Sequence, residues 1–346
     1  MSAPAPPPRA VVIGYGFSGR SFHSYLIGLD SGIALHGVAS RSDETRQRAA
    51  AERGCRTYPS FEAVLEDPDV DLVVLATPNN THCGLAVRAL DAGKHVVTDK
   101  VMALNLAECD RMIAAARRNR RLLSVFQNRR WDGDFLTVRR LLAEGRLGAV
   151  RRIEMAWTGF GMWGGWRGTR AAGGGKLYDL GAHLADQLCQ LLPQPITTVY
   201  ARLQYDDPAH DVESDAVVTV GFEDGATAVL ETSSICAIPK PRFYVAGSAG
   251  TFVKHGLDPQ EAAMKRGEID AAREDPATYG RLHDGKTETA IPTEAGRWRS
   301  YYENISAALA GAAPPAVTPE SVRRGVALLE AAFASGGSGQ EIHCRI

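Results

Sequence analysis

Strand-like and helix-like patterns alternate along the N-terminal part of the chain, and this alternation restricts the possible folds more than any other feature of the sequence. Short apolar runs rich in β-branched residues predict buried strands, and the longer segments between them predict helices. The expected strands are residues 10–14, 33–40, 71–76, 95–98 and 122–126, and the expected helices are residues 17–29, 42–54, 61–66, 81–92, 107–118 and 134–144. Such alternation over about 125 residues predicts a doubly wound α/β domain built around a parallel sheet.

The pattern changes in the second half, where strands follow one another through turns. The expected strands are residues 150–158, 197–205, 216–222, 226–233, 242–246 and 251–254, and the expected helices are residues 177–192, 298–310 and 320–334. This order predicts an α+β domain with one large, mostly antiparallel sheet. We therefore divide the chain into a short disordered arm (1–9), the doubly wound domain (10–130) and the second domain (131–346).

Length and composition agree with two globular domains. The chain has 346 residues, and about 150 residues per domain is typical. Apolar residues make up 45% and charged residues 23%, which excludes a disordered chain. Because 39 lysines and arginines nearly balance 40 acidic residues, there is no electrostatic reason to expect nucleic acid or a membrane surface as a partner.

The cysteines and the apolar runs are typical of a cytoplasmic protein. The six cysteines are widely spaced and form no CxxC pair, so we expect reduced thiols. No apolar run approaches the roughly 18–20 residues that span a bilayer, and the N-terminal MSAPAPPPR has no apolar signal core. No cluster of potential ligands has metal-binding spacing, so we expect no metal site.

A glycine-rich turn, GYGFSG, joins the first expected strand to the first expected helix. It matches the dinucleotide-binding pattern GxGxxG in the context that the pattern requires. Gly14 permits the tight turn, Gly16 lets backbone approach a pyrophosphate, and Gly19 lets the helix pack on the strand. The phosphates would bind free N–H groups at the start of the helix. The candidate cofactor-binding residues of this turn are Gly14, Tyr15, Gly16, Phe17, Ser18 and Gly19.

The end of the second strand indicates which dinucleotide binds. An acidic residue there would bind the ribose 2′-hydroxyl of NAD, but the sequence reads Ser40-Arg41-Ser42. A hydroxyl and a guanidinium suit the 2′-phosphate of NADP, and the first carboxylate follows only at Asp43. We expect NADP(H) as the preferred cofactor. NAD(H) stays possible, since Arg41 would also fit a solvated loop position.

Three further segments carry residues suited to catalysis. ATPNNTH (76–82) and the end of AGKHVVTDKV (92–101) follow strands of the parallel sheet, where open α/β sheets bind ligands. LYDLGAH (177–183) lies in the second domain, and its Asp179 and His183 are spaced to share one face of a helix. In isolation, such a pair is more often structural than catalytic.

Taken together, these ordered motifs resemble the Gfo/Idh/MocA family of oxidoreductases over roughly residues 10–345. Within the family, residues 126–137 and 252–261 are most similar to NADP-dependent scyllo-inositol dehydrogenase-like members. The resemblance implies an N-terminal Rossmann domain and a C-terminal domain with an open sheet. It also implies that this sheet joins subunits into a homodimer or homotetramer.

The resemblance implies roles for single residues. Lys100 matches the lysine of the family's Glu-Lys-Pro motif, which contacts substrate and cofactor, and Asp179 and His183 match its paired catalytic residues. Histidine titrates near neutral pH and suits the proton transfer that accompanies alcohol oxidation. Cofactor contacts are expected from Ser40, Arg41, Thr77, Pro78, Asn79, His82, Asp99, Lys100 and Asn128.

One departure from the family pattern lies at the catalytic lysine. The chain reads Asp99-Lys100-Val101 where the family has Glu-Lys-Pro with a commonly cis lysine–proline bond. A non-proline cis bond costs about 2.5–4 kcal/mol relative to trans. We expect either a trans bond with Lys100 displaced or a cis bond kept for function.

The segment 159–175, GFGMWGGWRGTRAAGGG, precedes Asp179 and His183, and nearly half of its residues are glycine. Its tryptophans and arginines suit a lid over a polyhydroxylated ring. The alternative is an irregular loop at a subunit contact. The candidate substrate residues are Asn128, Arg129, Trp163, Trp166, Arg167, Tyr178, Asp179 and His183.

These inferences predict an NADP-preferring dehydrogenase that interconverts a secondary alcohol and a ketone on a cyclitol or sugar. Two other readings stay open. The first is a catalytically weak nicotinamide-binding sensor or scaffold, which the departure at Val101 suggests. The second is redox-assisted cleavage of a glycoside.

Overall fold

The computed structural model describes residues 6–162 and 164–346. The predicted arm at residues 1–5 and the proposed substrate role of Trp163 therefore lie outside the described residues. The arm was predicted to extend to Arg9, but Arg9 is the first residue of a strand. It pairs with Ala34 of the neighbouring parallel strand, so the pairing starts one residue earlier than the apolar run.

The chain forms two compact units. The first runs to Asn128 and also contains Trp298–Val322, and the second contains Arg129–Arg297 and Arg323–Ile346. The sequence-based division differs at residues 298–322, which it placed in the second domain. Aromatic packing explains the difference, because the ring of Trp298 stacks on Phe22 with centroids 5.6 Å apart.

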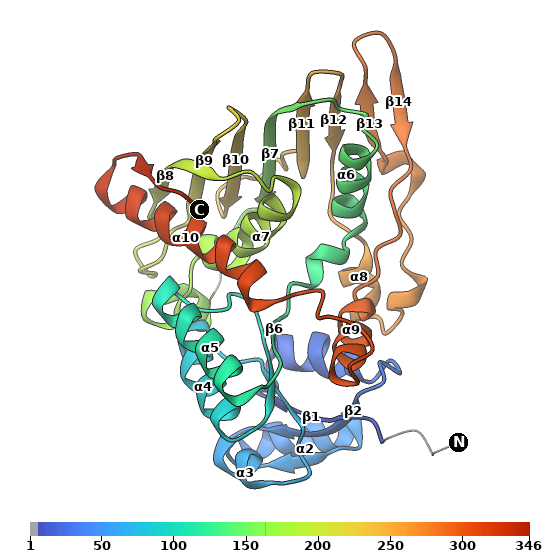
Figure 1. The fold of residues 1–346 in the computed structure, drawn as a ribbon, viewed down its shortest axis with the longest axis vertical. Coiled ribbons are helices and arrows are strands. Elements are labelled where there is room, and N and C mark those ends of the chain that lie inside the picture. The colour runs from blue at the N-terminus through green and yellow to red at the C-terminus, as the bar shows by residue number, and fades with distance from the viewer. Residues whose placement is uncertain (1–5, 163) are drawn as a thin grey trace. The chain divides into compact units, whose positions relative to one another are not determined.

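A six-stranded parallel sheet forms the centre of the first unit, with the strand order β3-β2-β1-β4-β5-β6 (Figure 1). This is the order of dinucleotide-binding doubly wound domains, and it confirms the predicted fold class. Only β3 was not predicted, because its three residues, Arg56–Tyr58, form no apolar run. The strands are β1 (Arg9–Ile13), β2 (Ala34–Ala39), β3 (Arg56–Tyr58), β4 (Leu72–Leu75), β5 (His95–Thr98) and β6 (Leu123–Val125).

Helices connect these strands, and serine or asparagine side chains cap several of them. Ser42, Ser60 and Asn105 each accept a hydrogen bond from a backbone N–H of the first helical turn. α4 and α5 lie side by side in Figure 1. The elements are a π-helix (Ser18–His23), α1 (Ser24–Ile27), α2 (Asp43–Arg53), α3 (Phe61–Glu66), a 3₁₀ turn (Asn79–Thr81), α4 (His82–Asp91), α5 (Leu106–Asn119) and α9 (Arg299–Leu309).

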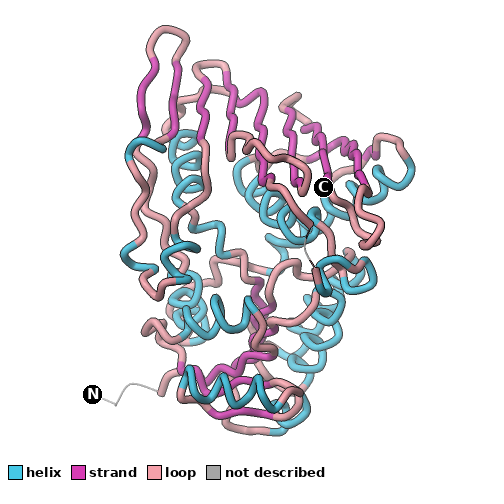
Figure 2. Tube along the Cα trace, turned by 180° about the vertical axis from the view of Figure 1, so that it is seen from behind, coloured by secondary structure: helices cyan, strands magenta, loops and turns pink. Residues whose placement is uncertain are grey.

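The second unit contains a nine-stranded sheet in the order β14-β13-β12-β11-β7-β10-β9-β8-β15. Its strands are drawn in magenta at the top of Figure 2. Its pairs are antiparallel except for β10 with β7, so the prediction of a large, mostly antiparallel sheet is confirmed. The last three strands along the chain, β13, β14 and β15, were not predicted. The strands are β7 (Val150–Thr158), β8 (Ile196–Gln204), β9 (Asp215–Phe222), β10 (Thr227–Ser233), β11 (Phe243–Gly247), β12 (Thr251–Lys254), β13 (Gly280–His283), β14 (Glu288–Ile291) and β15 (Ile342–His343).

Buried and half-buried residues alternate along β9 and β10, which shows that one face of this sheet packs on the core. Figure 1 shows α6, α7 and α10 on one side of it. None of the helices within the described residues is long and apolar enough to cross a bilayer. The elements are α6 (Gly133–Ala143), a π-helix (Leu177–Gly181), α7 (Ala182–Leu191), α8 (Gln260–Lys265), α10 (Pro319–Ser338) and 3₁₀ turns at Asn128–Trp131, Gly165–Gly168, Arg170–Ala172, Ile269–Ala271 and Pro276–Thr278.

Candidate active site

The glycine-rich turn adopts the geometry that the motif requires. Gly14 has φ +92°, and a Cβ there would lie 2.5 Å from the carbonyl oxygen of Ala76. A Cβ on Gly19 would lie 2.0 Å from the carbonyl oxygen of Gly14. A Cβ on Gly16 would meet no protein atom within 4 Å. Two of the three glycines are therefore needed by the fold itself, and the third faces open space where a phosphate can approach.

The other predicted cofactor residues of the first unit follow the ends of its strands. Because all strands of this sheet are parallel, their carboxyl ends meet at one edge. The residues occupy positions after β1, β2, β4, β5 and β6, namely 14–19, 40–41, 77–79, 99–100 and 128. The sheet thus gathers most of the predicted cofactor set at the edge where open α/β sheets bind ligands.

Asp99 is the centre of a hydrogen-bonded cluster at this edge. Its carboxylate accepts from Oγ of Ser18 and from the backbone N–H of Lys100, the latter at 2.8 Å, and lies 3.6 Å from Nε2 of His23. Burial alone would raise the pKa of Asp99, but the His23 and Ser18 contacts and the charge of Lys100 hold it well below its usual range. The cluster connects the π-helix Ser18–His23, which follows the glycine-rich turn, to the loop that carries Lys100. Sequence reasoning missed His23, since only the fold brings it to Asp99.

His82 connects two loops at this edge of the sheet. Its side chain is completely buried, and its ring nitrogens lie 2.7 Å from the carbonyl oxygen of Val101 and 3.0 Å from that of Thr77. The ring therefore links the loops after β4 and β5. These contacts give the imidazole a structural role, and the expected cofactor contact of His82 stays a prediction. The neighbouring Asn79 is also buried, at 3% exposure.

The catalytic lysine candidate lies at the end of β5. Lys100 is half-buried, and the Lys100–Val101 peptide bond is cis. Of the two expected arrangements, the structure therefore has the cis bond.

Buried polar atoms near the ends of β5 and β6 test whether a cofactor fits. Thr98 Oγ1, Gln127 Oε1 and Asn128 Nδ2 have no hydrogen-bond partner among the residues that the structure describes. A buried polar group without a partner is costly, so these atoms suit a ligand with both donors and acceptors. The carboxamide of a nicotinamide is such a group. Together with the open space beside Gly16, these atoms fit a bound dinucleotide.

The turn after β2 carries more positive charge than its sequence indicated. Arg41 is exposed. Arg46, one helical turn further on, donates from Nη1 to the carbonyl oxygen of Ser40 at 2.6 Å and pairs with Asp43. The first carboxylate after the turn thus has a guanidinium partner on its own helix. Arg46 was not predicted, because its position at the turn depends on the path of α2.

In the second unit, the predicted catalytic helix begins as a π-helix. Asp179 lies in the π-helical part, Leu177–Gly181, and His183 lies in α7. Both side chains are mostly buried, with exposures of 13% for the Asp179 side chain and 6% for His183. Single π turns within helices occur frequently at functional sites. The expected regular helix was therefore wrong in its first turn.

The glycine-rich segment packs against the start of this helix. Nε of Arg167 lies 3.2 Å from Oδ2 of Asp179, and the Arg167 guanidinium lies 4.6 Å from the ring centroid of Trp166. A Cβ on Gly175 would lie 2.4 Å from Oε1 of Glu213. Two predicted substrate residues, Trp166 and Arg167, are thus connected to Asp179.

Lys176 is a buried cation directly before the π-helix, at 4% exposure. Burial lowers its pKa to about 8, while the charge of Asp179 acts in the opposite direction. Lys176 is therefore not a solvated surface charge.

Two predicted substrate residues have packing partners inside the second unit. The ring of Tyr178 lies 4.6 Å from that of Phe333 in α10. Arg129 is 4% exposed and donates to Oε2 of Glu261 at 2.8 Å. These contacts give both side chains a role in the fold.

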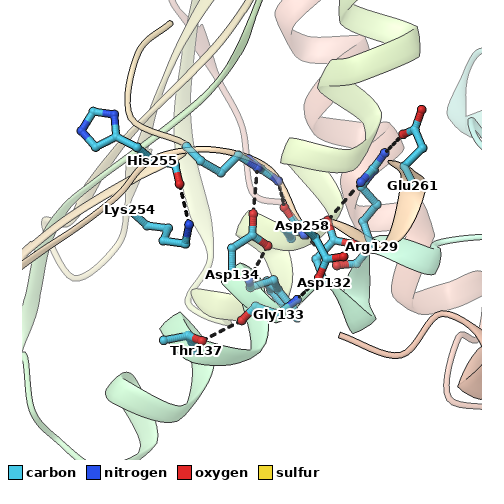
Figure 3. A network of polar contacts seen from close by, with 12 residues as sticks. Arg129, Asp132, Gly133, Asp134, Thr137, Lys254, His255, Asp258 and Glu261 are labelled. Atoms are coloured by element: carbon cyan, nitrogen blue, oxygen red, sulfur yellow. Dashed lines mark hydrogen bonds and ion pairs between the residues drawn. The ribbon is translucent and has the colours of Figure 1, made fainter. Parts of the chain in front are cut away.

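Arg129 belongs to a network of buried charges around the start of α6 (Figure 3). Oδ2 of Asp258 accepts from the backbone N–H of Gly133 at 2.7 Å, and burial raises the pKa of Asp258. Nε of Arg242 lies 3.5 Å from Oδ2 of Asp134. Two of its arginines, Arg129 and Arg242, lie against the indole of Trp157, which neither motif nor spacing had indicated.

Thiols and metal ligands give no further site. Each of the six cysteines is free. Within residues 6–162 and 164–346, no group of three or more histidine, cysteine or acidic side chains could hold a metal ion.

Comparison with known proteins agrees with these two units. Residues 8–127 match the model of the oxidoreductase family with an NAD-binding Rossmann fold. Residues 135–253 match the model of the GFO/IDH/MocA C-terminal domain. Together the two matches cover more than half of the chain.

Individual relatives extend over nearly the full length. YdgJ of Escherichia coli (strain K12), described as an uncharacterized oxidoreductase, is 37% identical, over 88% of this chain and 89% of its own. The scyllo-inositol 2-dehydrogenase (NADP(+)) IolW of Bacillus subtilis (strain 168) is 32% identical, over 94% and 92%. A crystal structure of an NAD-binding protein from Listeria innocua has a TM-score of 0.86 at 32% identity, over 97% and 96%. The chain therefore belongs to the Gfo/Idh/MocA family of oxidoreductases.

Proposed function

We propose that the protein is an NADP-preferring dehydrogenase that interconverts a secondary alcohol and a ketone on a cyclitol or sugar. The observation that carries the proposal is the buried His183 in α7, directly after the π-helical turn that holds Asp179, in a chain that also has an intact dinucleotide turn. The similarity to IolW, which is named for scyllo-inositol and NADP, supports this substrate class.

The bound nicotinamide would accept or supply a hydride at its C4 atom. His183 is the proposed acid/base, and in the oxidative direction its imidazole takes the proton of the substrate hydroxyl. Lys100 is proposed to hydrogen-bond the same oxygen and to stabilise its developing negative charge. Asp179, which is bound to Arg167, is proposed to orient the imidazole or to bind a neighbouring hydroxyl.

The charges after β2 support the preference for NADP. Arg41 is exposed, and Asp43, the first carboxylate after the turn, pairs with Arg46. Guanidinium groups bind phosphate with paired, charge-assisted hydrogen bonds. Ser40 adds a hydroxyl at the same turn. We propose that Arg41 binds the 2′-phosphate and that Arg46 holds the turn.

We also propose that the nine-stranded sheet joins subunits into a homodimer or homotetramer. The family resemblance supports this, and one face of the sheet is already packed on the core. Light scattering coupled to gel filtration measures the mass, and a monomer at micromolar concentration would contradict the proposal.

The function is tested by following nicotinamide absorbance with a panel of inositols, aldoses and their keto forms. We expect turnover with at least one polyol and with NADP. His183→Gln should lower kcat by about 10²–10⁴-fold while leaving NADPH affinity unchanged. Absence of turnover with every polyol would refute the proposed substrate class, and full activity of His183→Gln would refute the mechanism.

A further inference from the structure

The indole of Trp157 is a direct neighbour of the imidazole of His183. Trp157 lies near the end of β7, and its ring stacks on that of His183 with centroids 5.7 Å apart and an angle of 26° between the planes. Stacked aromatic rings at such distances attract one another beyond the effect of burial. Since His183 is also 6% exposed, the indole limits how far the imidazole can rotate.

Two buried guanidinium groups lie against the same indole. The central carbon of Arg129 is 4.3 Å from the Trp157 ring centroid, and that of Arg242 is 5.6 Å away. Both arginines are at most 4% exposed. Tryptophan is the preferred aromatic partner of arginine, and desolvation strengthens the attraction. The two arginines therefore hold the indole in place independently of its contact with the imidazole.

Both arginines donate to side-chain acceptors, and the contact of Arg129 with Glu261 is drawn in Figure 3. Arg129 donates to Glu261 at 2.8 Å and to Asp132 at 3.3 Å. Arg242 donates from Nη2 to Oε1 of Gln187 at 2.5 Å.

Gln187 connects this network back to the catalytic helix. It lies one helical turn after His183 on α7, and its Nε2 donates to the carbonyl oxygen of Arg129 at 2.8 Å. The helix that carries His183 and the arginines that hold Trp157 therefore belong to one hydrogen-bonded unit. A side chain within such a network keeps one orientation more strictly than a side chain held by apolar contacts alone.

We infer that Trp157 is a positioning residue for His183, with Arg129 and Arg242 holding its indole in place. The inference rests on the proposed function, in which His183 exchanges a proton with the substrate. Trp157 would act through His183: it presents the imidazole in the orientation in which a ring nitrogen faces the hydroxyl proton. Proton transfer depends steeply on such alignment, and a misplacement of about 1 Å can cost about 10²-fold in rate.

Two substitutions separate positioning from a merely structural role. Trp157→Phe keeps an aromatic ring against His183, whereas Trp157→Leu keeps bulk without a ring. We expect kcat of Trp157→Leu to fall by about 10–100-fold, with KM within about threefold and with a larger solvent deuterium isotope effect. Trp157→Phe should restore kcat to within about threefold of the original protein.

Tyr244→Leu is the matched control. Tyr244 on β11 also has an arginine of β7 against its ring, with the central carbon of Arg152 5.3 Å from the ring centroid. No histidine ring of the described residues is stacked on it. The kcat of Tyr244→Leu should therefore equal that of the original protein. Equal losses in Trp157→Phe and Trp157→Leu together with a lower unfolding temperature, or an unchanged kcat in Trp157→Leu, would overturn the inference.

A second measurement does not depend on activity. In protein labelled with ¹³C at the histidine Cε1 atoms, the His183 signal is identified by its loss in His183→Gln. Ring currents from a stacked indole should move this signal upfield, and Trp157→Leu should return it toward the position of free histidine. An unmoved signal would overturn the inference even if every substrate assay failed, while absence of turnover with a shifted signal would contradict only the proposed function.

Discussion

Replacing Gly16 with alanine should separate cofactor binding from folding. A Cβ at this position meets no protein atom within 4 Å, and Gly16 is not among the glycines with positive φ. Alanine for glycine at a compatible position stabilises a protein by about 0.4–1 kcal/mol. The new methyl group would, however, occupy the space proposed for the pyrophosphate. We expect the Kd for NADPH to rise at least about tenfold, which corresponds to about 1.4 kcal/mol.

Gly19→Ala should have the opposite effect. Its Cβ would lie 2.0 Å from the carbonyl oxygen of Gly14, whereas real Cβ contacts stay above 3.0 Å. The helix must therefore move by roughly 1 Å against backbone, and forced packing of this kind costs about 1–3 kcal/mol. We expect the free energy of unfolding to fall by that amount. Gly84→Ala, an exposed glycine of α4 with no neighbour within 4 Å, is the matched control.

Urea unfolding followed by circular dichroism measures the free energy of unfolding of each variant, and titration calorimetry measures its Kd for NADPH. The reasoning is refuted if Gly16→Ala binds NADPH like the original protein, because the phosphate would then not pass over Gly16. It is also refuted if Gly16→Ala is destabilised as much as Gly19→Ala.

Three further predictions concern charge. Arg41→Ala should weaken NADPH binding by about 10–100-fold with NADH binding nearly unchanged, and equal effects on both cofactors would contradict selection at this turn. Since the pKa of Lys176 is lowered to about 8, the unfolded chain binds more protons than the folded one between about pH 8 and 10.4. The stability of the original protein relative to Lys176→Met should therefore rise by about 3 kcal/mol across that window in urea unfolding, and a flat difference would exclude the shift. Asp99→Asn should lower stability at neutral pH and lose that deficit in acid, because the depressed pKa of Asp99 contributes stability only while the carboxylate is ionised. Unfolding midpoints from neutral to acid pH test this.

The elements with strong local patterns could be predicted from the sequence. β5, β7, β12 and α3 have the predicted bounds, because apolar residues recur within the strands and a capping serine marks the start of the helix. β3 and β15 were missed, since strands of two or three residues depend on the neighbours that pair with them. The π-helical turns were also missed, because a shift in helical hydrogen bonding follows from packing.

The residues of the candidate site also differ in how far the sequence could predict them. The glycine turn and the residues that follow the strands are set by local geometry and topology, and the sequence identified them. His23, Arg46 and Trp157 were missed, since their partners Asp99, Ser40 and His183 are reached only through the fold. The burial of His82 was not predicted either, because sequence alone does not show which polar side chains the fold encloses.

Transfer of deuterium from labelled cofactor tests the central claim most directly. The protein is incubated with NADPH carrying deuterium at C4, in separate preparations for the two faces of the ring, and with the keto form of the polyol found in the panel. Mass spectrometry and NMR of the product should show one deuterium on the new carbinol carbon from one of the two preparations, and none in His183→Gln over the same time. A reduced product without deuterium from either preparation would contradict hydride transfer from the nicotinamide, and with it the proposed dehydrogenase.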